Sequence, residues 1–153
     1  MSEMWDDITT FHKKFSIPQQ ELPSYPSKEM MEFRIKFLQE ELDEFVVAYG
    51  NENLVKGFDA LIDLVYVAMG TAYIMNVPWD KGWYGVQAAN LAKVRAKKAS
   101  HSTRGSTFDV VKPTGWVPPD QLLLAEVLLH EHAMLMRRHK DPLGPYKTED
   151  DNE

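Results

Sequence analysis

Hydrophobic residues recur along most of the chain at the spacing of a helix rather than in the alternation of a strand. A first segment, Met4 to Phe15, carries apolar residues on one helical face and ends before Pro18. A second segment runs from about Lys28 to Tyr49 and follows Ser27, a typical N-cap residue. Its apolar stripe consists of Met31, Ile35, Leu38, Leu42, Phe45 and Tyr49. Alternating spacings of four and three predict a helix of an antiparallel bundle.

The third segment, roughly Asn53 to Asn76, is apolar nearly all round, so we expect a central helix that is covered on every side. Between Ala60 and Met75 its only charged residue is Asp63. The segment is too short and too interrupted for a convincing membrane span, and its flanks carry no anchoring pattern. Pro78 ends it.

A fourth helix is expected over Trp79–Ser100, with a basic C-terminal end. Residues 101–119 lack helical periodicity and predict a long loop that can hold a short hairpin. Asp120 can cap a fifth helix that runs to about His139. The pattern therefore predicts an all-α fold, a four- to five-helix bundle in a single domain over residues 1–140. Residues 141–153 are expected to be an acidic, disordered tail.

Composition excludes several kinds of protein. The 153-residue chain is 44% hydrophobic and carries a net charge of −6, whereas a nucleic-acid binder held by phosphate contacts normally shows a basic excess. It contains no cysteine, which excludes disulfides and thiolate zinc sites. The N-terminal residues are polar and acidic, without the features of a secretion signal. We therefore expect a cytoplasmic protein that binds neither nucleic acid nor membrane.

Three glutamates on the second helix form the pattern E-E-x-x-E. At about 100° per residue, Glu41 and Glu44 fall at the edge of the apolar stripe, and Glu40 lies further round the helix. Two carboxylates therefore border the predicted core. The alternative is a solvated acidic face in which Lys36 pairs with Glu40, four residues later.

Asp63 gives the acidic cluster more weight. Burial of a carboxylate among uncharged residues costs several kcal/mol unless a cation or hydrogen-bond donors compensate it. Asp59 lies one turn earlier on the same face, so the third helix offers two carboxylates toward the second helix. Oxygen ligands from facing helices suit Mg²⁺, which prefers sites shared with phosphates. The alternative is a buried salt bridge from Asp63 to Arg34 or Lys93.

Other metal and phosphate sites are disfavoured. Di-iron bundles need Glu-x-x-His pairs, and the chain contains none. His130 and His132 are two residues apart on a helix and point about 200° apart, so a shared metal is not expected. The glycine-rich phosphate-binding patterns are also missing, so phosphates would be bound by side chains and metal.

Basic residues supply candidate phosphate ligands. Asn90 and Lys93 share one face of the predicted fourth helix, and Lys97 follows a turn later. An amide and ammonium groups beside a magnesium site would suit a triphosphate. Lys112 and Arg104, in the long loop, could close over the phosphates. The alternative is a solvated basic helix end that complements the helix dipole.

Aromatic residues supply candidate contacts to a base. Phe11, His12 and Phe15 could stack on or edge a base, although Phe11 and Phe15 also fit an ordinary core. Trp116 lies between Gly115 and two prolines, where it is either a lid or an anchor that packs the loop.

These motifs together resemble the MazG-like, all-α nucleoside triphosphate pyrophosphohydrolase superfamily, which includes phosphoribosyl-ATP pyrophosphohydrolases and dimeric dUTPases. The resemblance extends from about Phe11 to Asp120. It is carried by F-H-x-x-F, R-x-x-x-L-x-E-E-x-x-E, D-A-L-I-D-L-V-Y-V, A-N-L-A-K and K-P-T-G-W-V-P-P-D, in that order.

The resemblance implies hydrolysis of a nucleoside triphosphate to a monophosphate and pyrophosphate, with Mg²⁺ or Mn²⁺, by a homodimer or homotetramer. It implies that Glu41, Glu44 and Asp63 hold the metal and that Glu40 orients or deprotonates the attacking water. Asn90 and Lys93 would position the phosphates. The family's usual fourth acid is replaced by Ala60, and Asp59 is the nearest substitute.

The tryptophan-containing loop looks like that of bacteriophage-type members, which would act in the host cytoplasm. A purine deoxynucleotide such as dGTP is the expected substrate. Two alternatives stay open: an enzyme of the same fold acting on phosphoribosyl-ATP or a modified nucleotide, and a non-catalytic helical interaction domain.

Overall fold

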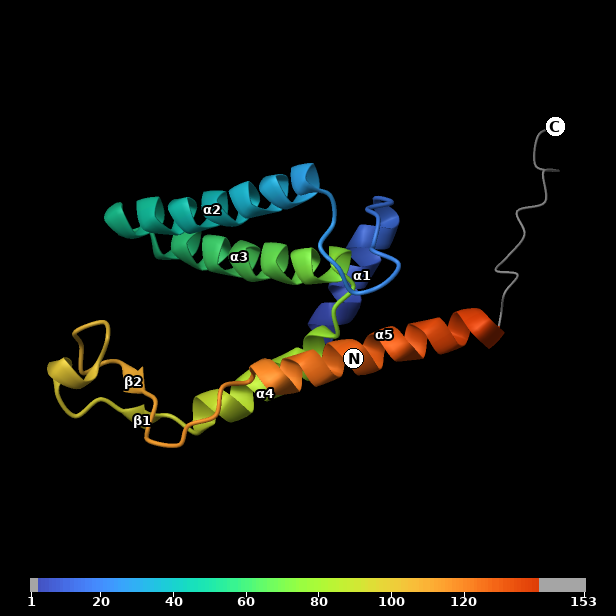
Figure 1. Cartoon of the computed structure of the whole chain (residues 1–153). Coiled ribbons are helices and arrows are strands. Elements are labelled where there is room, and N and C mark those ends of the chain that lie inside the picture. Colours follow the sequence, from blue (N-terminus) through green and yellow to red (C-terminus); the bar gives the residue numbers. More distant parts are fainter. Residues whose placement is uncertain (1–2, 141–153) are drawn as a thin grey trace.

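The computed structural model describes residues 3–140, and the predicted tail at 141–153 lies outside the described residues. The helices are α1 (Glu3–Lys14), α2 (Lys28–Gly50), α3 (Leu54–Ile74), α4 (Trp79–Leu91) and α5 (Asp120–Lys140). Two short strands, β1 (Val94–Arg95) and β2 (Val110–Val111), and a 3₁₀ turn at Ala99–His101 lie between α4 and α5. Helices α2 and α3 form one antiparallel pair, α4 and α5 form a second, and α1 lies across the C-terminal end of α3 (Figure 1). The all-α prediction is confirmed.

Capping side chains set the start of both helices of the first pair. The Ser27 hydroxyl accepts a hydrogen bond from the Met30 amide at 3.2 Å, and Asn53 Oδ1 accepts one from the Lys56 amide at 3.1 Å. Between them, Glu52 has a φ of 51°, which reverses the chain within a short turn. The two helices are therefore held antiparallel by a connection that leaves little freedom of register.

The seam of α2 against α3 is set by a spacing of seven residues. The buried residues of α2 are Arg34, Glu41 and Ala48. Ala48 is level with Gly57 of α3, where the absence of a side chain allows the helices to approach. Two of the three seam positions are therefore charged.

Helix α1 docks on the seam through a buried histidine. His12 is 2% exposed, and its Nδ1 donates to the Ile8 carbonyl at 2.8 Å. The ring lies against Gly70 and beside Arg34. Arg34 itself donates to Thr71 Oγ1 at 3.0 Å and to the Val67 carbonyl at 2.6 Å. The histidine and the arginine thus fix α1, α2 and α3 relative to one another, beside a small core of Ile8, Met69, Tyr73 and Ile74.

Helix α5 is tied to the rest of the protein through Asn76, which has a φ of 56° and is 4% exposed. Its Nδ2 donates to the Gln20 carbonyl at 2.8 Å, and its Oδ1 lies 3.2 Å from His130 Nε2 on α5. Leu122 and Leu123 of α5 pack beside Gly85 and Gly82 of α4, respectively. The C-terminal helix therefore packs on its own protomer.

The fourth helix is shorter than its sequence predicts. It ends at Leu91 instead of Ser100, and the chain enters a hairpin in which Val94 pairs with Val111 and Arg95 with Val110. The Ala96 amide adds a hydrogen bond to the Asp109 carbonyl at 3.0 Å. These residues pair with a segment about fifteen positions away, and β-branched valines favour that extended state over a helix.

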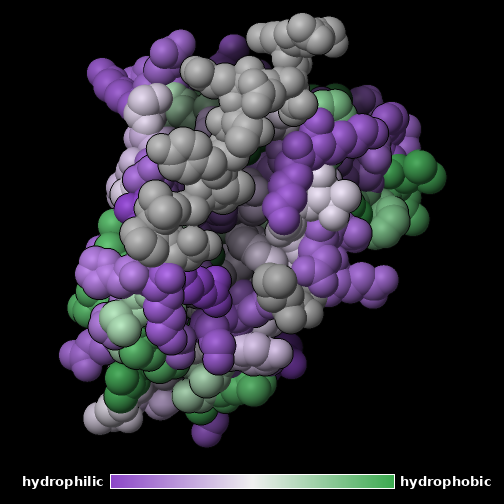
Figure 2. Space-filling view, turned by 90° about the vertical axis from the view of Figure 1, so that its right-hand side faces the viewer, coloured by the Kyte–Doolittle hydropathy of each residue, from purple (hydrophilic) through white to green (hydrophobic). Residues whose placement is uncertain are grey.

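The expectation of a central, fully covered α3 is wrong for the single chain. Helix α2 and α1 cover one side, while large hydrophobic residues on the other side stay exposed: Phe58 at 65%, Leu61 at 44%, Ile62 at 53% and Val65 at 48%. Hydrophobic side chains also reach the surface between hydrophilic ones in Figure 2. By length and composition alone α3 could cross a membrane, a test that core helices of soluble proteins also pass.

We predict that Gly70→Ala destabilises the protein by about 1–3 kcal/mol, because a buried ring would have to move. A Cβ at Gly70 would lie 2.8 Å from His12 Cε1 and 3.1 Å from Arg34 Nη2. Urea unfolding measures the change. Gly50→Ala is the control, since a Cβ there meets nothing within 4 Å. Equal stabilities of the two variants would contradict this account of the α1 docking site.

We also predict that acid weakens the fold through its half-buried and buried histidines. Burial lowers the pKa of His12 and of His130 below the usual 6.5, so the folded state binds fewer protons there than the unfolded chain. Their stabilising contribution is present above about pH 6.5 and is lost as the pH falls through the lowered pKa values. Urea midpoints compared between about pH 7.5 and 5.5 should fall less steeply for His130→Gln than for the wild type. An identical fall of the urea midpoint with pH in both proteins would show that His130 does not contribute to the acid sensitivity.

Candidate active site

Five carboxylates lie on the facing helices α2 and α3, and only one of them is buried. Glu41 is 8% exposed because it lies seven residues after Arg34, on the face of α2 that meets α3. The others are exposed: Glu40 and Glu44 on α2, and Asp59 and Asp63 on α3. The structure therefore brings the predicted acids to one pair of helices, around a single carboxylate in the seam.

The pKa of Glu41 reflects the negative charge of the whole cluster. Burial raises the pKa of the Glu41 carboxyl, and the negative charges of neighbouring acids raise it further. In decreasing order of effect these neighbours are Asp63, Glu44, Glu40 and Asp59. The charged form of Glu41 is therefore disfavoured in free energy, and a nearby cation would offset this penalty.

Two of the five acids already have partners. Lys36 lies 3.7 Å from Glu40, the pair that the solvated-face alternative predicts. Lys56 lies 3.1 Å from Asp59, and this hydrogen bond is the main reason that the pKa of Lys56 is raised. Within residues 3–140, Glu44 and Asp63 form no ion pair or hydrogen bond. Sequence reasoning overlooked Lys56, although its spacing of three from Asp59 on a helix could have indicated it.

The reasoning from burial of Asp63 needs correction. Its side chain is exposed in the single chain. It also forms no salt bridge with the two partners considered: Arg34 is bonded to Thr71 and Val67, and Lys93 is bonded to Asn90. Of the neighbouring charges, that of Asp63 raises the pKa of Glu41 the most.

The carboxylates of this cluster are ligands of the kind that a divalent cation prefers, but they do not form a complete coordination site. Among the described residues, no three His, Asp or Glu side chains gather closely enough to hold a metal ion. The mutual repulsion at Glu41 is nevertheless what Mg²⁺ or Mn²⁺ would relieve, and oxygen donors are the ligands such ions prefer. The donors are therefore of the chemical type that such an ion prefers, but in the described residues they are not gathered into one site.

A second group of predicted residues assembles at the base of the hairpin. The Trp116 indole Nε1 donates to the Ala89 carbonyl at 2.7 Å and so joins the loop to the end of α4. Lys112 Nζ lies 4.6 Å and Lys93 Nζ 5.7 Å from the centre of the Trp116 ring. Lys93 also donates to Asn90 Oδ1 at 2.8 Å. Trp116 is thus an anchor for the loop, and two ammonium groups lie at one indole.

Two other basic residues are placed differently from their prediction. Lys97 is exposed in the hairpin, since α4 ends before it, and does not continue the face of Asn90 and Lys93. Arg104 Nη1 donates to Asp109 Oδ1 at 2.7 Å, so its charge is already paired within the loop. The basic group is therefore smaller than the sequence suggested, and no ion pair joins it to the five acids within the described chain.

The predicted base-contact residues divide into two kinds. His12 is buried between α1 and α3, so its position contradicts direct contact with a base in this conformation. Phe11 and Phe15 remain 39% and 56% exposed and pack against each other with ring centroids 4.8 Å apart. Only these two rings remain available to a ligand.

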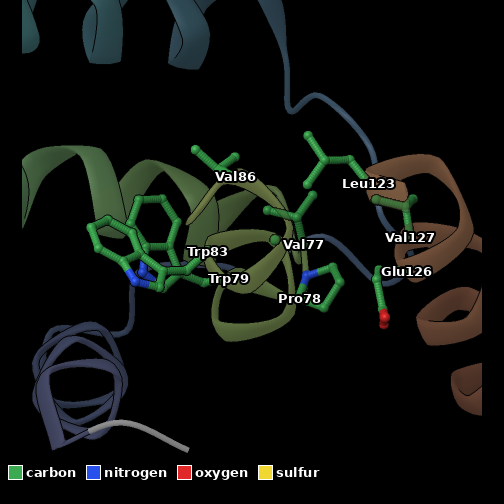
Figure 3. A pocket seen from close by; sticks show the side chains of 9 residues that line it. Val77, Pro78, Trp79, Trp83, Val86, Leu123, Glu126 and Val127 are labelled. Carbon is green, nitrogen blue, oxygen red and sulfur yellow. The ribbon is translucent and has the colours of Figure 1, made fainter. Parts of the chain in front are cut away.

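Two cavities differ in their relation to the acids. One, of about 330 Å³, lies at the α2–α3 turn and is lined by Glu44 and Lys56 among others. Another, of about 430 Å³, lies between α4 and α5 and is lined almost entirely by hydrophobic residues. Trp79 and Trp83 lie on one side of it and Glu126 of α5 on the other (Figure 3). The cavity at the turn contacts one of the five acids, Glu44, whereas none of the five lines the larger apolar cavity.

The fold and the acidic helices define a MazG-like nucleotide pyrophosphohydrolase. The chain belongs to the phosphoribosyl-ATP pyrophosphohydrolase family, which it matches over residues 8–90, more than half of its length. The matched region covers α2, α3 and most of α1, and ends with Asn90 of α4. A search of curated proteins finds no matching relative.

We predict that Glu41→Gln raises the thermal stability of the metal-free protein by a few degrees. A raised carboxyl pKa means that charged Glu41 opposes folding above the pKa of the unfolded chain, and this penalty fades as the pH falls through the raised value. The neutral amide removes it at neutral pH. Thermal melts in a chelating buffer measure the effect. Glu32→Gln, an exposed change on the same helix, should not raise the melting temperature, and equal shifts in both variants would refute the interpretation.

Proposed function

We propose that the protein hydrolyses a nucleoside triphosphate to a monophosphate and pyrophosphate, with Mg²⁺ or Mn²⁺ as cofactor, in nucleotide-pool metabolism. The family gives the reaction class. The observation that supports a metal-dependent site is Glu41, which is buried in the seam and surrounded by four further carboxylates without enough cations to balance them.

Glu41, Glu44 and Asp63 would hold the divalent cation, and Asp59 is the least favoured of the possible ligands because Lys56 already pairs with it. The cation would supply charge stabilisation to the phosphates. Glu40 lies one residue from Glu41 at the exposed edge of the helix, where its carboxylate can orient a water and accept its proton.

Lys93, Asn90, Lys112 and Trp116 would bind the phosphates. Within residues 3–140 the ammonium groups of Lys93 and Lys112 have no carboxylate partner, and Trp116 holds both near one position. Two unneutralised cations at a fixed place suit a polyanion. Phe11 and Phe15 are the aromatic groups that could contact a base.

The protein would act as a homodimer or homotetramer. The exposed face of α3 presents Phe58, Ile62 and Val65 beside the carboxylates, and a second copy could cover it. Such pairing would also surround Asp63 with protein and exclude water from the site. We place the protein in the cytoplasm, which is the host cytoplasm if a bacteriophage encodes it.

A purine deoxynucleotide such as dGTP is our proposed substrate. The second candidate is phosphoribosyl-ATP, and it is favoured by one specific observation, the description of the matched family. An assay of pyrophosphate release across the common ribo- and deoxyribonucleoside triphosphates and phosphoribosyl-ATP separates the two. Turnover of none of them would overturn the proposal, and release of orthophosphate would change the bond that is cleaved.

We predict that Glu41→Gln and Asp63→Asn each lower kcat/KM on the order of 100-fold or more, since each removes a charged metal ligand. Asp43→Asn is the matched control, because Asp43 is exposed on the same helix and accepts only a hydrogen bond from Gln39. Titration with Mn²⁺, followed by electron paramagnetic resonance, should show weaker binding for the first two variants alone. A non-catalytic interaction domain would leave metal binding unchanged in all three.

A further inference from the structure

A cavity of about 400 Å³ lies where α1, the α1–α2 loop, the α3–α4 connection and α5 meet (Figure 1). Aromatic and polar side chains line it together, unlike the neighbouring cavity between α4 and α5, which is almost entirely hydrophobic. None of the five acids lines it, and neither do the two lysines at Trp116. Along α3, Asp63 lies about 16 Å from the last residue of the helix, Ile74. The cavity is therefore separate from the candidate active site.

Two indole rings form the aromatic part of the cavity wall. The rings of Trp5 of α1 and Trp79 of α4 are nearly parallel, with 4° between their planes and 6.2 Å between their centroids. Both side chains are half-buried and pack against the small core beside α1, which holds their orientation. Indole faces are large, rigid surfaces on which a planar ring can stack.

The polar part of the wall includes a hydrogen-bond acceptor on His130. Asn76 Nδ2 donates to the Gln20 carbonyl at 2.8 Å, so the other polar atom of this amide, Oδ1, can only accept. His130 Nε2 lies 3.2 Å from that oxygen and must carry the hydrogen, which leaves Nδ1 of the neutral ring as an acceptor. Burial lowers the pKa of His130 and so favours the neutral ring. Within residues 3–140, no group donates to this Nδ1.

Gln19 adds a second polar group to the wall. Its side chain is exposed, and its amide forms no hydrogen bond with the rest of the described chain. A primary amide offers a donor and an acceptor side by side, and the edges of nucleobases match this pair. Asp80 and Lys81 also line the cavity, and their opposite charges balance. The lining therefore suits an uncharged planar ring with polar edges better than a free phosphate.

We propose that this cavity is a second binding site, which takes the base of a nucleoside. The base stacks on the indoles of Trp5 and Trp79, one of its N–H groups donates to His130 Nδ1, and the Gln19 amide pairs with another edge. The volume of about 400 Å³ lies within the range of small-molecule sites in proteins. The inference does not depend on the proposed activity.

Fluorescence titration of the full-length protein with adenosine, guanosine and cytidine in a chelating buffer tests the site. These nucleosides lack the phosphates that the acids and a metal would bind. Stacking quenches indole emission, so we expect saturable quenching with a Kd below about 1 mM for at least one nucleoside, and none with ribose. Failure of all three nucleosides to bind in this range would overturn the proposal.

Two tryptophan variants locate the bound base, with affinity measured by calorimetry. Trp79→Leu should weaken binding at least about tenfold, because it removes one stacking surface. Trp83→Leu is the matched control, since Trp83 is on the same helix and lines the hydrophobic cavity but not this one. Equal losses of affinity in the two variants would overturn the proposal.

Gln19→Ala provides a test that does not alter the packing of α1 and α4. It should weaken binding by about fivefold, the loss expected for one hydrogen-bonding group, whereas Gln87→Ala, an exposed change on α4 outside the cavity, should not. Phe15→Leu separates this site from the candidate base contact beside the acids. Retained affinity in this variant is the expected result, and a loss there would place the nucleoside at the other site and overturn the proposal, whatever the outcome of the pyrophosphate assay.

Discussion

The packing of α2 against α3 is the constraint on which the rest of the structure depends. Three α2 residues seven positions apart meet α3, and each is accommodated differently. Ala48 fits because Gly57 opposes it, and Arg34 fits because Thr71 and the Val67 carbonyl accept its hydrogens. At Glu41, burial and the charges of neighbouring carboxylates raise the pKa of the carboxyl. The same seam that aligns the helices therefore creates a position of unbalanced negative charge, and the chemistry of the candidate site follows from that position.

The supports of this position are rigid for identifiable reasons. Arg34 is buried and bonded to α3, and His12 of α1 lies against Gly70, where no other residue would leave room for the ring. Asn76 then connects the end of α3 to the α1–α2 loop and to α5. Buried polar groups with several partners restrict motion more than apolar contacts of similar size. The acids at the centre of α2 and α3 are thus carried by helices that are fixed at one end by these contacts.

The sequence predicted the five helices and placed the five acids on α2 and α3, because helical periodicity encodes which residues share a face. It could not predict the end of α4 at Leu91, since the pairing of Val94 with Val111 is a contact between distant segments. It also misled about Asp63. A helix that is apolar all round has the same sequence pattern whether its own chain or a second chain covers it. The exposure of Asp63 in the single chain could therefore not be predicted from the sequence. The sequence also suggested that His12 contacts a base, whereas the structure buries its side chain.

That ambiguity of apolar helices bears on the assembly of the protein. Within the described chain the buried hydrophobic residues are few, whereas large hydrophobic residues remain exposed on α3 and on α5. Monomeric proteins rarely leave such continuous apolar surface in water. The charges are distributed in a related way, with acids on the α2–α3 pair and unpaired lysines at the hairpin base. Association of identical chains would remove apolar surface from water, and it offers a route by which cations of one copy reach the carboxylates of another. Burial and charge therefore give separate reasons to propose an oligomer, in which a second copy would cover the exposed hydrophobic residues of α3.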